Sequence, residues 1–241
     1  VDYLTSDLLK VRYNVKDVNE EFASIRDVLW PHAQLNLLEV HIDDQDILTP
    51  RIIVLEPDYL LDISALAECF RPYGAHPLNY LLSKLQPINN PRPLLLGSIA
   101  NHFLDEWIYL GDQLDYRSSM QKVFQDYALQ LASCPDLNDH KLELEFFKDC
   151  KWHYDNIGKI VNETFEEEGY KLDKSDAVLE PSYICEALGV QGRLDYMQRD
   201  MSSFIEMKSG KADEYAIHGK ITPHINHRVQ MLLYQAVLYF N

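Results

Sequence analysis

The first sixty residues carry apolar residues in short blocks separated by polar breaks. The runs LNLLEVHI (35–42) and RIIVLEP (51–57) have the composition and length of β-strands. The stretch DDQD between them is typical of a turn. We therefore expect residues 1–60 to form a small β-rich lead-in.

The middle of the chain has apolar residues at helical spacing. From residue 98 to 110 they recur every three or four positions, and Gly97 or Ser98 would begin that helix. The Pro- and Asn-rich stretch before it, 86–93, predicts a loop. The other predicted helices begin near Ser64, or span 117–132 and 138–168, the last of them ending at Gly169.

After Asp173 the pattern changes to strand-like runs that lie close together in sequence. They are AVLEPSYICEALGV (177–190), QGRLDYM (191–197) and SSFIEMKSG (202–210). The last segment, 224–241, is strongly apolar and predicts a helix. The order of elements predicts an α/β domain over residues 61–241, after the β-rich lead-in.

Composition is that of a globular protein, with 46% hydrophobic and 25% charged residues. The net charge of −16 argues against a phosphate-binding surface, because nucleic-acid binding normally needs basic residues. The acidity is uneven, however. Residues 191–228 hold six Lys or Arg, five Asp or Glu, and three His, so this segment is locally neutral to basic.

No apolar run is long enough to cross a membrane, and no secretory signal opens the chain. We therefore expect an intracellular location, cytoplasmic if the source is bacterial. The chain begins with Val1, so we expect it to be part of a longer polypeptide. Its four cysteines are widely spaced without a CxxC pair, which favours reduced thiols over a zinc site.

Asp195 and Glu206 carry the most specific chemical pattern. They flank the stretch RDMSS, and a hairpin centred on Asp200 and Met201 would place them directly opposite each other. Lys208 follows two residues after Glu206 and would share their face. The other face would carry a set of apolar residues for packing against helices: Leu194, Tyr196, Ile205 and Met207.

Two carboxylates so close together repel unless a cation lies between them. Mg²⁺ commonly uses one or two carboxylates with water and substrate phosphate. Such an ion lowers the pKa of its water and stabilises charge on a phosphate, while Lys208 would orient or activate the attacking water. The pattern therefore predicts metal-dependent phosphodiester hydrolysis.

The strings GRLD and IEMKSGK resemble the core of the PD-(D/E)XK nuclease superfamily, and more narrowly its RecB-like branch. That branch pairs Asp with E-x-K, follows them with a Q-x-x-x-Y helix, and has an upstream helical His. The chain is most similar to the nuclease domain of the eukaryotic-type replication helicase–nuclease and to CRISPR-associated adaptation nucleases. The matching positions here are His102, Asp195, Glu206-Met207-Lys208, and Gln230 with Tyr234.

The resemblance implies a restriction-endonuclease-like core, with a mixed central sheet flanked by helices. It implies Mg²⁺ or Mn²⁺ held by His102, Asp195, Glu206 and the backbone carbonyl of Met207. It also implies a deoxyribonuclease, acting as an exonuclease or on flaps and single strands, with a helicase domain in the same polypeptide. Residues expected to contact DNA or support the site are Gln230, Tyr234, Lys211 and Arg228.

Two features depart from the family pattern. Ser98 stands four residues before His102, where relatives usually have Gly. The flap-trimming relatives also carry a four-Cys iron–sulfur cluster, and Cys69 is at the position of its first ligand. The other three ligands would follow Asn241. Either the domain is truncated at its C-terminus, or a 4Fe-4S cluster was never present.

Competing interpretations remain open. The hairpin charges could form a surface ion-pair cluster, and His102 could be a core residue. Glu106 is expected on a solvated helix face, while Glu180 is an undecided contributor to the metal region. At the level of function, the alternatives are a catalytically inactive RecB-like domain that binds DNA or a partner, and an acidic protein-interaction domain.

Overall fold

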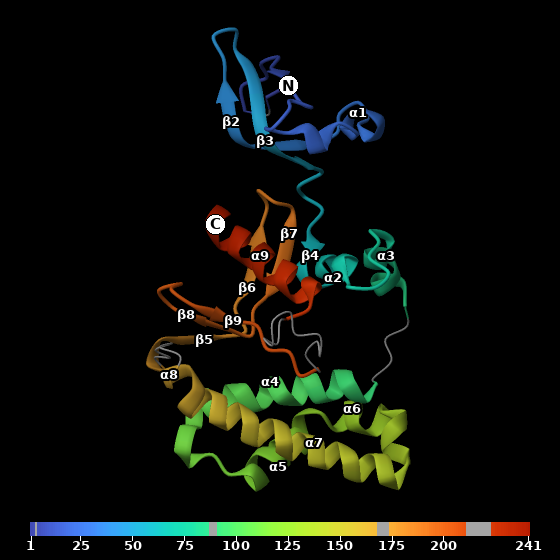
Figure 1. Ribbon diagram of the computed structural model, residues 1–241, viewed down its shortest axis with the longest axis vertical. Coiled ribbons are helices and arrows are strands. Elements are labelled where there is room, and N and C mark those ends of the chain that lie inside the picture. The colour runs from blue at the N-terminus through green and yellow to red at the C-terminus, as the bar shows by residue number, and fades with distance from the viewer. Residues whose placement is uncertain (3, 87–90, 168–173, 211–222) are drawn as a thin grey trace, which may run out of the picture.

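The computed structural model describes residues 1–2, 4–86, 91–167, 174–210 and 223–241 (Figure 1). The predicted α/β class is confirmed. Within the described residues the strands form three small three-stranded sheets, where the sequence predicted one mixed central sheet. None of the described helices combines the length and apolar composition that a membrane crossing requires.

The predicted N-terminal β-rich segment forms the first sheet. Its central strand, β3 (Ile47–Leu55), pairs antiparallel with β2 (Leu35–Ile42) and parallel with β1 (Lys10–Val11). The short helix α1 (Ile25–Val28) lies beside this sheet (Figure 1). β3 begins four residues before the prediction, because the Asp43 carboxylate accepts the backbone N–H of Ile47 and makes the turn tight.

The other two sheets meet at Asp195. One sheet has the order β4-β7-β6 and the other β5-β8-β9. Their strands are β4 (Leu61–Asp62), β5 (Ala177–Leu179), β6 (Ser182–Cys185), β7 (Val190–Arg193), β8 (Tyr196–Gln198) and β9 (Phe204–Ile205). Only Leu194 and Asp195 separate β7 from β8. The chain therefore leaves one sheet and enters the other at this point.

Helices form a layer on one side of the third sheet, where α4 packs along α7 (Figure 1). This layer consists of α4 (Arg92–Leu110), α5 (Tyr116–Asp126), α6 (Ala128–Ser133), α7 (His140–Lys159), a π-helical turn (Ile160–Thr164) and α8 (Phe165–Glu167). α4 begins before the predicted Gly97 or Ser98, because a proline in the first helical turn, Pro93, loses no hydrogen bond there.

One further boundary in this layer differs from the prediction, and another lies outside the described residues. The predicted helix 117–132 is divided into α5 and α6 at Tyr127, whose backbone departs from helical geometry. Its side chain has another role, since the hydroxyl donates to the Ser98 carbonyl at 3.2 Å. Gly169, the predicted end of the long helix, lies outside the described residues.

The remaining helices gather around the second sheet. They are α2 (Ile63–Ala67), α3 (Leu78–Leu85) and α9 (Ile225–Phe240). α2 is capped by Asp62, whose carboxylate accepts from Ala65 N, and not by the predicted Ser64. α9 lies across β6 and β7 and contacts α2 (Figure 1).

The hairpin packs on two separate hydrophobic cores. Tyr196, Ile205 and Met207 pack with the α4–α7 core, whereas Leu194 is fully buried in the core beneath α9. The prediction that these four side chains share one face is therefore wrong for Leu194. The bend at Asp195 shifts the alternation of side chains, so residues on either side of it enter different cores.

Gly158 shows how closely α7 approaches α4. A Cβ at this position would lie 2.5 and 2.7 Å from ring carbons of Trp107. We expect Gly158→Ala to destabilise the protein by about 1–3 kcal/mol despite alanine's better helix propensity, because the ring must move. Thermal unfolding should show a melting temperature several degrees lower. Gly210→Ala is the control, since a Cβ there meets nothing within 4 Å; equal melting temperatures would contradict the packing.

Candidate functional site

The hairpin has the register that the sequence predicts. Tyr196 pairs with Ile205 and Met197 with Phe204. The next step of this register places Asp195 opposite Glu206. The turn contains Asp200, whose carboxylate accepts the N–H of Ser202 at 2.9 Å. The two carboxylates thus come from adjacent strands at the open end of the hairpin.

Asp195 is held from two sides. Its Oδ1 accepts a hydrogen bond from Asn101 Nδ2 of α4 at 2.9 Å, and its Oδ2 accepts from the backbone N–H of Met207 at 2.6 Å. The first contact ties the hairpin to the helical layer. The second spans the two strands. Together they fix the carboxylate without neutralising its charge.

Glu206 is the more deeply enclosed carboxylate, with its side chain only 9% exposed. Its Oε1 accepts from Lys208 Nζ at 2.8 Å and from Gln230 Nε2 of α9 at 2.7 Å. Its Oε2 is buried and has no hydrogen-bond partner among the described residues. A buried carboxylate oxygen without a donor is costly, so this atom marks a place for a cation or water.

Burial is the main reason that the pKa values of both Asp195 and Glu206 lie above their ordinary values. Asp195 adds its negative charge to the effect on Glu206. Hydrogen bonds to both carboxylates and the charge of Lys208 act in the opposite direction but do not outweigh burial. When both carboxylates are ionised, the single charge of Lys208 leaves the site net negative, which is the electrostatic condition that favours a divalent cation.

Asp105 extends this negative region along α4. Burial, with the charges of Glu180 and Asp195, raises its pKa to about 7. A carboxyl whose pKa is higher in the folded than in the unfolded state costs stability as pH rises from about 4 towards 7. In the metal-free protein Asp105 therefore contributes a loss of stability across that interval.

We expect Asp105→Asn to remove much of this loss. At pH 8 in EDTA, chemical unfolding should show a gain of about 1–2 kcal/mol over the parent, allowing for solvent screening. The gain should shrink as pH falls through 7 and vanish near pH 4. Asp126→Asn, on the exposed surface of α5, is the control. A gain that is independent of pH would contradict the assignment.

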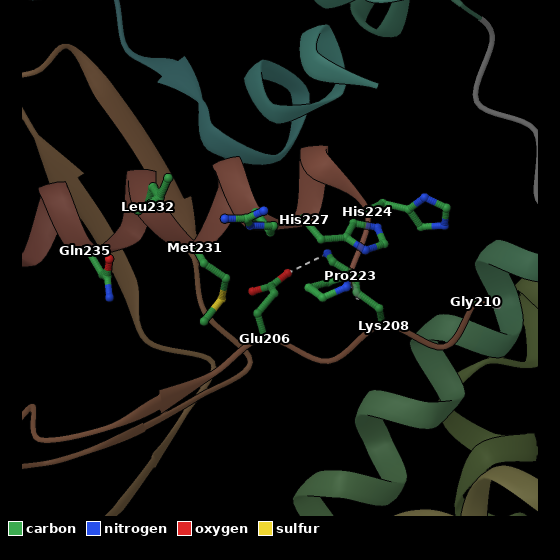
Figure 2. A pocket seen from close by; sticks show the side chains of 10 residues that line it. Glu206, Lys208, Gly210, Pro223, His224, His227, Met231, Leu232 and Gln235 are labelled. Carbon is green, nitrogen blue, oxygen red and sulfur yellow. Dashed lines mark hydrogen bonds and ion pairs between the residues drawn. The ribbon is translucent and has the colours of Figure 1, made fainter. Parts of the chain in front are cut away.

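A cavity lies directly over the carboxylates. It has a volume of about 340 Å³ and is lined by Asp195, Glu206 and Lys208, together with α4 residues such as Gly97 and Asn101. A neighbouring cavity of about 550 Å³ opens between Glu206, Lys208 and the first three turns of α9. Figure 2 shows Glu206 and Lys208 pointing toward each other below α9, with His227 and Met231 above them.

Gln230 and Tyr234 support the site from α9, one helical turn apart. Gln230 Nε2 also lies 3.1 Å from Ser64 Oγ, and the Tyr234 hydroxyl donates to the Arg193 carbonyl at 2.6 Å. Both side chains are buried. Gly192 permits this approach, since a Cβ there would lie 3.0 Å from the Tyr234 ring. These two residues therefore position the hairpin.

The structure does not bring His102 to the carboxylates. Its Nε2 lies 3.5 Å from Glu106 Oε2 and has no hydrogen-bond partner among the described residues, while Asn101 is the α4 residue that contacts Asp195. No three His, Cys, Asp or Glu side chains in the described ranges lie close enough together to hold one ion. The sequence did not indicate Asn101 as a site residue, because it belongs to none of the motifs that single out the other site residues.

Glu106 does not lie on a solvated helix face, so that prediction is wrong. It is 7% exposed, binds Lys122 Nζ at 2.7 Å and contacts the Ser119 hydroxyl. These two partners come from α5, which packs against α4. α5 therefore covers the face of α4 that was predicted to be exposed to solvent. Glu106 therefore has a structural partner in Lys122.

The other four predicted residues lie in different places. Arg228 lines the larger cavity near Lys208. Lys211 lies outside the described residues. Cys69 is a partly buried thiol whose Sγ lies 3.5 Å from the Pro77 carbonyl. Glu180 is paired with Arg193 at 3.2 Å. None of the four cysteines is in a disulfide bond.

The donor set suits a hard divalent cation. Asp195 and Glu206 provide carboxylate oxygens, and the buried Oε2 of Glu206 has a free acceptor position. Mg²⁺ and Mn²⁺ bind oxygen ligands of this kind and complete their coordination with water. Met207, the middle residue of E-x-K, offers its backbone carbonyl as a further oxygen ligand next to Glu206 in the sequence.

No family model, curated protein or solved structure matches this chain. The function is therefore inferred from the hairpin and its surroundings.

Proposed function

We propose that this chain is a Mg²⁺- or Mn²⁺-dependent DNA nuclease domain. The observation that carries the proposal is the pair of buried carboxylates, Asp195 and Glu206, opposed across one hairpin with Lys208 beside them. Their raised pKa values and the unpartnered Glu206 Oε2 support a cation between them. A surface ion-pair cluster accounts poorly for this burial, because such pairs are normally solvated.

The proposed roles follow from the contacts. Asp195 and Glu206 would hold the metal, and the ion would supply charge stabilisation for the phosphate and a more acidic water. Lys208 reaches the same cavity and positions the attacking water or a phosphate oxygen. Asn101 and Gln230 orient the two carboxylates through their amide groups. Arg228 contributes positive charge at the mouth of the larger cavity.

The finer parts of the proposal come from the resemblance to RecB-like nucleases. They are a restriction-endonuclease-like arrangement of the core, single-stranded or flap DNA as substrate, and a helicase domain in the same polypeptide. The resemblance also implies His102 as a ligand, but the structure places it beside Glu106 and not at the carboxylates. The test compares the affinity for Mn²⁺ of His102→Ala and Asn101→Ala. If His102 is a ligand, its loss should lower that affinity more than the loss of Asn101, which orients Asp195.

The experiment that tests the proposal is cleavage of end-labelled DNA in the presence of Mg²⁺ or Mn²⁺. Single-stranded, flap and duplex substrates of the same sequence should be compared, with EDTA as the metal-free control. We expect metal-dependent cleavage, fastest on substrates with an unpaired strand. Product lengths then distinguish removal of nucleotides from ends and internal cutting. Binding without cleavage under every metal condition would instead support the inactive DNA-binding domain.

A further inference from the structure

Two long segments of this chain contain no acidic residue. Acidic residues make up 38 of the 241 residues, yet residues 69–104 contain no Asp or Glu. The same segment contains Arg71, Lys84 and Arg92. A second acid-free segment runs from residue 215 to the end and includes all of α9. In a protein of net charge −16, these two segments are the regions least repulsive to a polyanion.

The two acid-free segments meet in the fold. Asn226, in the first turn of α9, donates to Glu68 Oε1 at 2.8 Å, and Glu68 also pairs with Arg71 at 2.5 Å. The next residues of α9, His227 and Arg228, line the cavity that contains Glu206 and Lys208. The first turn of α9 therefore lies between the cavity at Glu206 and Lys208 and the segment that carries Phe70.

This surface also presents aromatic rings to solvent. Tyr73 is 85% exposed and Phe70 is 46% exposed. Phe70 and His76 line an apolar hollow of about 520 Å³. The loop that carries Tyr73 is fixed, because Asn79 Nδ2 donates to the Gly74 carbonyl at 2.9 Å. Exposed rings on an ordered backbone are suited to stacking on flat partners without a large ordering cost.

We propose that the surface formed by Phe70, Arg71, Tyr73 and Lys84 is a second contact for a single nucleic-acid strand that extends from the hairpin cavity. Exposed aromatic rings with interspersed cations form the combination that binds unpaired strands, through base stacking and phosphate attraction. The one acidic side chain named beside them, Glu68, is paired with Arg71 and Asn226. An acidic peptide would use the cations but would leave the rings without stacking partners. The inference rests on the proposed nuclease function for the origin of the strand.

Stacking makes Tyr73 the strongest test. With a fluorescein-labelled single-stranded oligonucleotide in EDTA, fluorescence anisotropy should show affinity about tenfold weaker for Tyr73→Ala than for the parent. Lys84→Ala should weaken binding about threefold and reduce its salt dependence. Tyr109→Ala is the matched control, because Tyr109 is 69% exposed at the opposite end of α4. Circular dichroism and melting temperature should be unchanged in all three variants.

Three results would overturn the inference. The first is that Tyr73→Ala binds the single strand as tightly as the Tyr109→Ala control does. The second is that Tyr73→Ala loses as much affinity for the matched duplex as for the single strand. The third is that the parent binds oligo-glutamate of the same charge as tightly as the oligonucleotide. The last result would show electrostatic attraction without recognition of bases.

A second readout separates this inference from the proposed function. Mn²⁺-dependent hydrolysis of bis(p-nitrophenyl) phosphate tests the hairpin alone, because this small diester does not reach α3. We expect Tyr73→Ala to keep that rate and to raise KM, at constant kcat, only on oligonucleotides. If the parent hydrolyses neither substrate, the proposed function fails. If it hydrolyses both and KM is unchanged in Tyr73→Ala, only the second contact fails.

Discussion

Lys208→Ala is expected to reduce metal-dependent DNA cleavage by about a thousandfold or more, because it removes the only cationic side chain bonded to Glu206 among the described residues. Binding of Mn²⁺ should persist, since both carboxylates remain. The folded structure should also persist, because the Lys208 side chain is 36% exposed. Single-turnover cleavage and thermal unfolding with and without Mn²⁺ measure these quantities separately.

Asp195→Asn should behave differently from Lys208→Ala. It should lose both cleavage and the thermal stabilisation by Mn²⁺, because the amide cannot replace a charged ligand. In EDTA above pH 7 it should be at least as stable as the parent, since burial raises the pKa of Asp195.

Lys151→Ala is the control for Lys208→Ala, because Lys151 pairs with Asp155 on the exposed surface of α7. Parent-like cleavage by Lys208→Ala would remove that residue from the mechanism.

Gln230→Leu is expected to lower the affinity for Mn²⁺ by about 10- to 100-fold, the usual effect of removing a partner that orients a metal ligand. The Gln230 amide is one of two groups that bind Glu206 Oε1, and it fixes this carboxylate to α9. Leucine has a similar volume, so the helix should still pack. A titration of cleavage rate against Mn²⁺ should shift to higher concentration and recover much of the parent rate at saturation.

Two further variants make this result specific. Ser64→Ala removes the hydroxyl that lies 3.1 Å from Gln230 Nε2 but leaves the bond to Glu206, so its effect should be smaller. Gln121→Leu changes an exposed glutamine of α5 and should leave the titration unchanged. A loss of rate in Gln230→Leu that Mn²⁺ cannot restore would contradict a positioning role.

Local patterns predicted the hairpin well. Strand alternation and the polar RDMSS stretch placed the turn at Asp200 and Met201, and the structure has Asp195 and Glu206 in that opposed register. The Q-x-x-x-Y spacing placed Gln230 and Tyr234 on one helical face, and both side chains contact the hairpin. These features depend on neighbours within a few residues, which a sequence displays directly.

Contacts between distant segments were not predictable in the same way. The hydrogen bond of Asn101 to Asp195 joins residues 94 positions apart. Burial of Glu106 depends on where α5 packs, since its partners Ser119 and Lys122 lie on that helix. The bend at Asp195, which sends Leu194 into the core beneath α9, follows from the chain passing between two sheets. Such outcomes depend on tertiary packing.

The most direct test of the central claim is the anomalous scattering of Mn²⁺ in crystals of the parent and of Asp195→Asn. The account predicts a peak within coordination distance of the Asp195 and Glu206 carboxylates in the parent, and its loss in Asp195→Asn. Crystals saturated with Mn²⁺ that show no peak at these two carboxylates would contradict the assignment of this hairpin as a metal-dependent nuclease site.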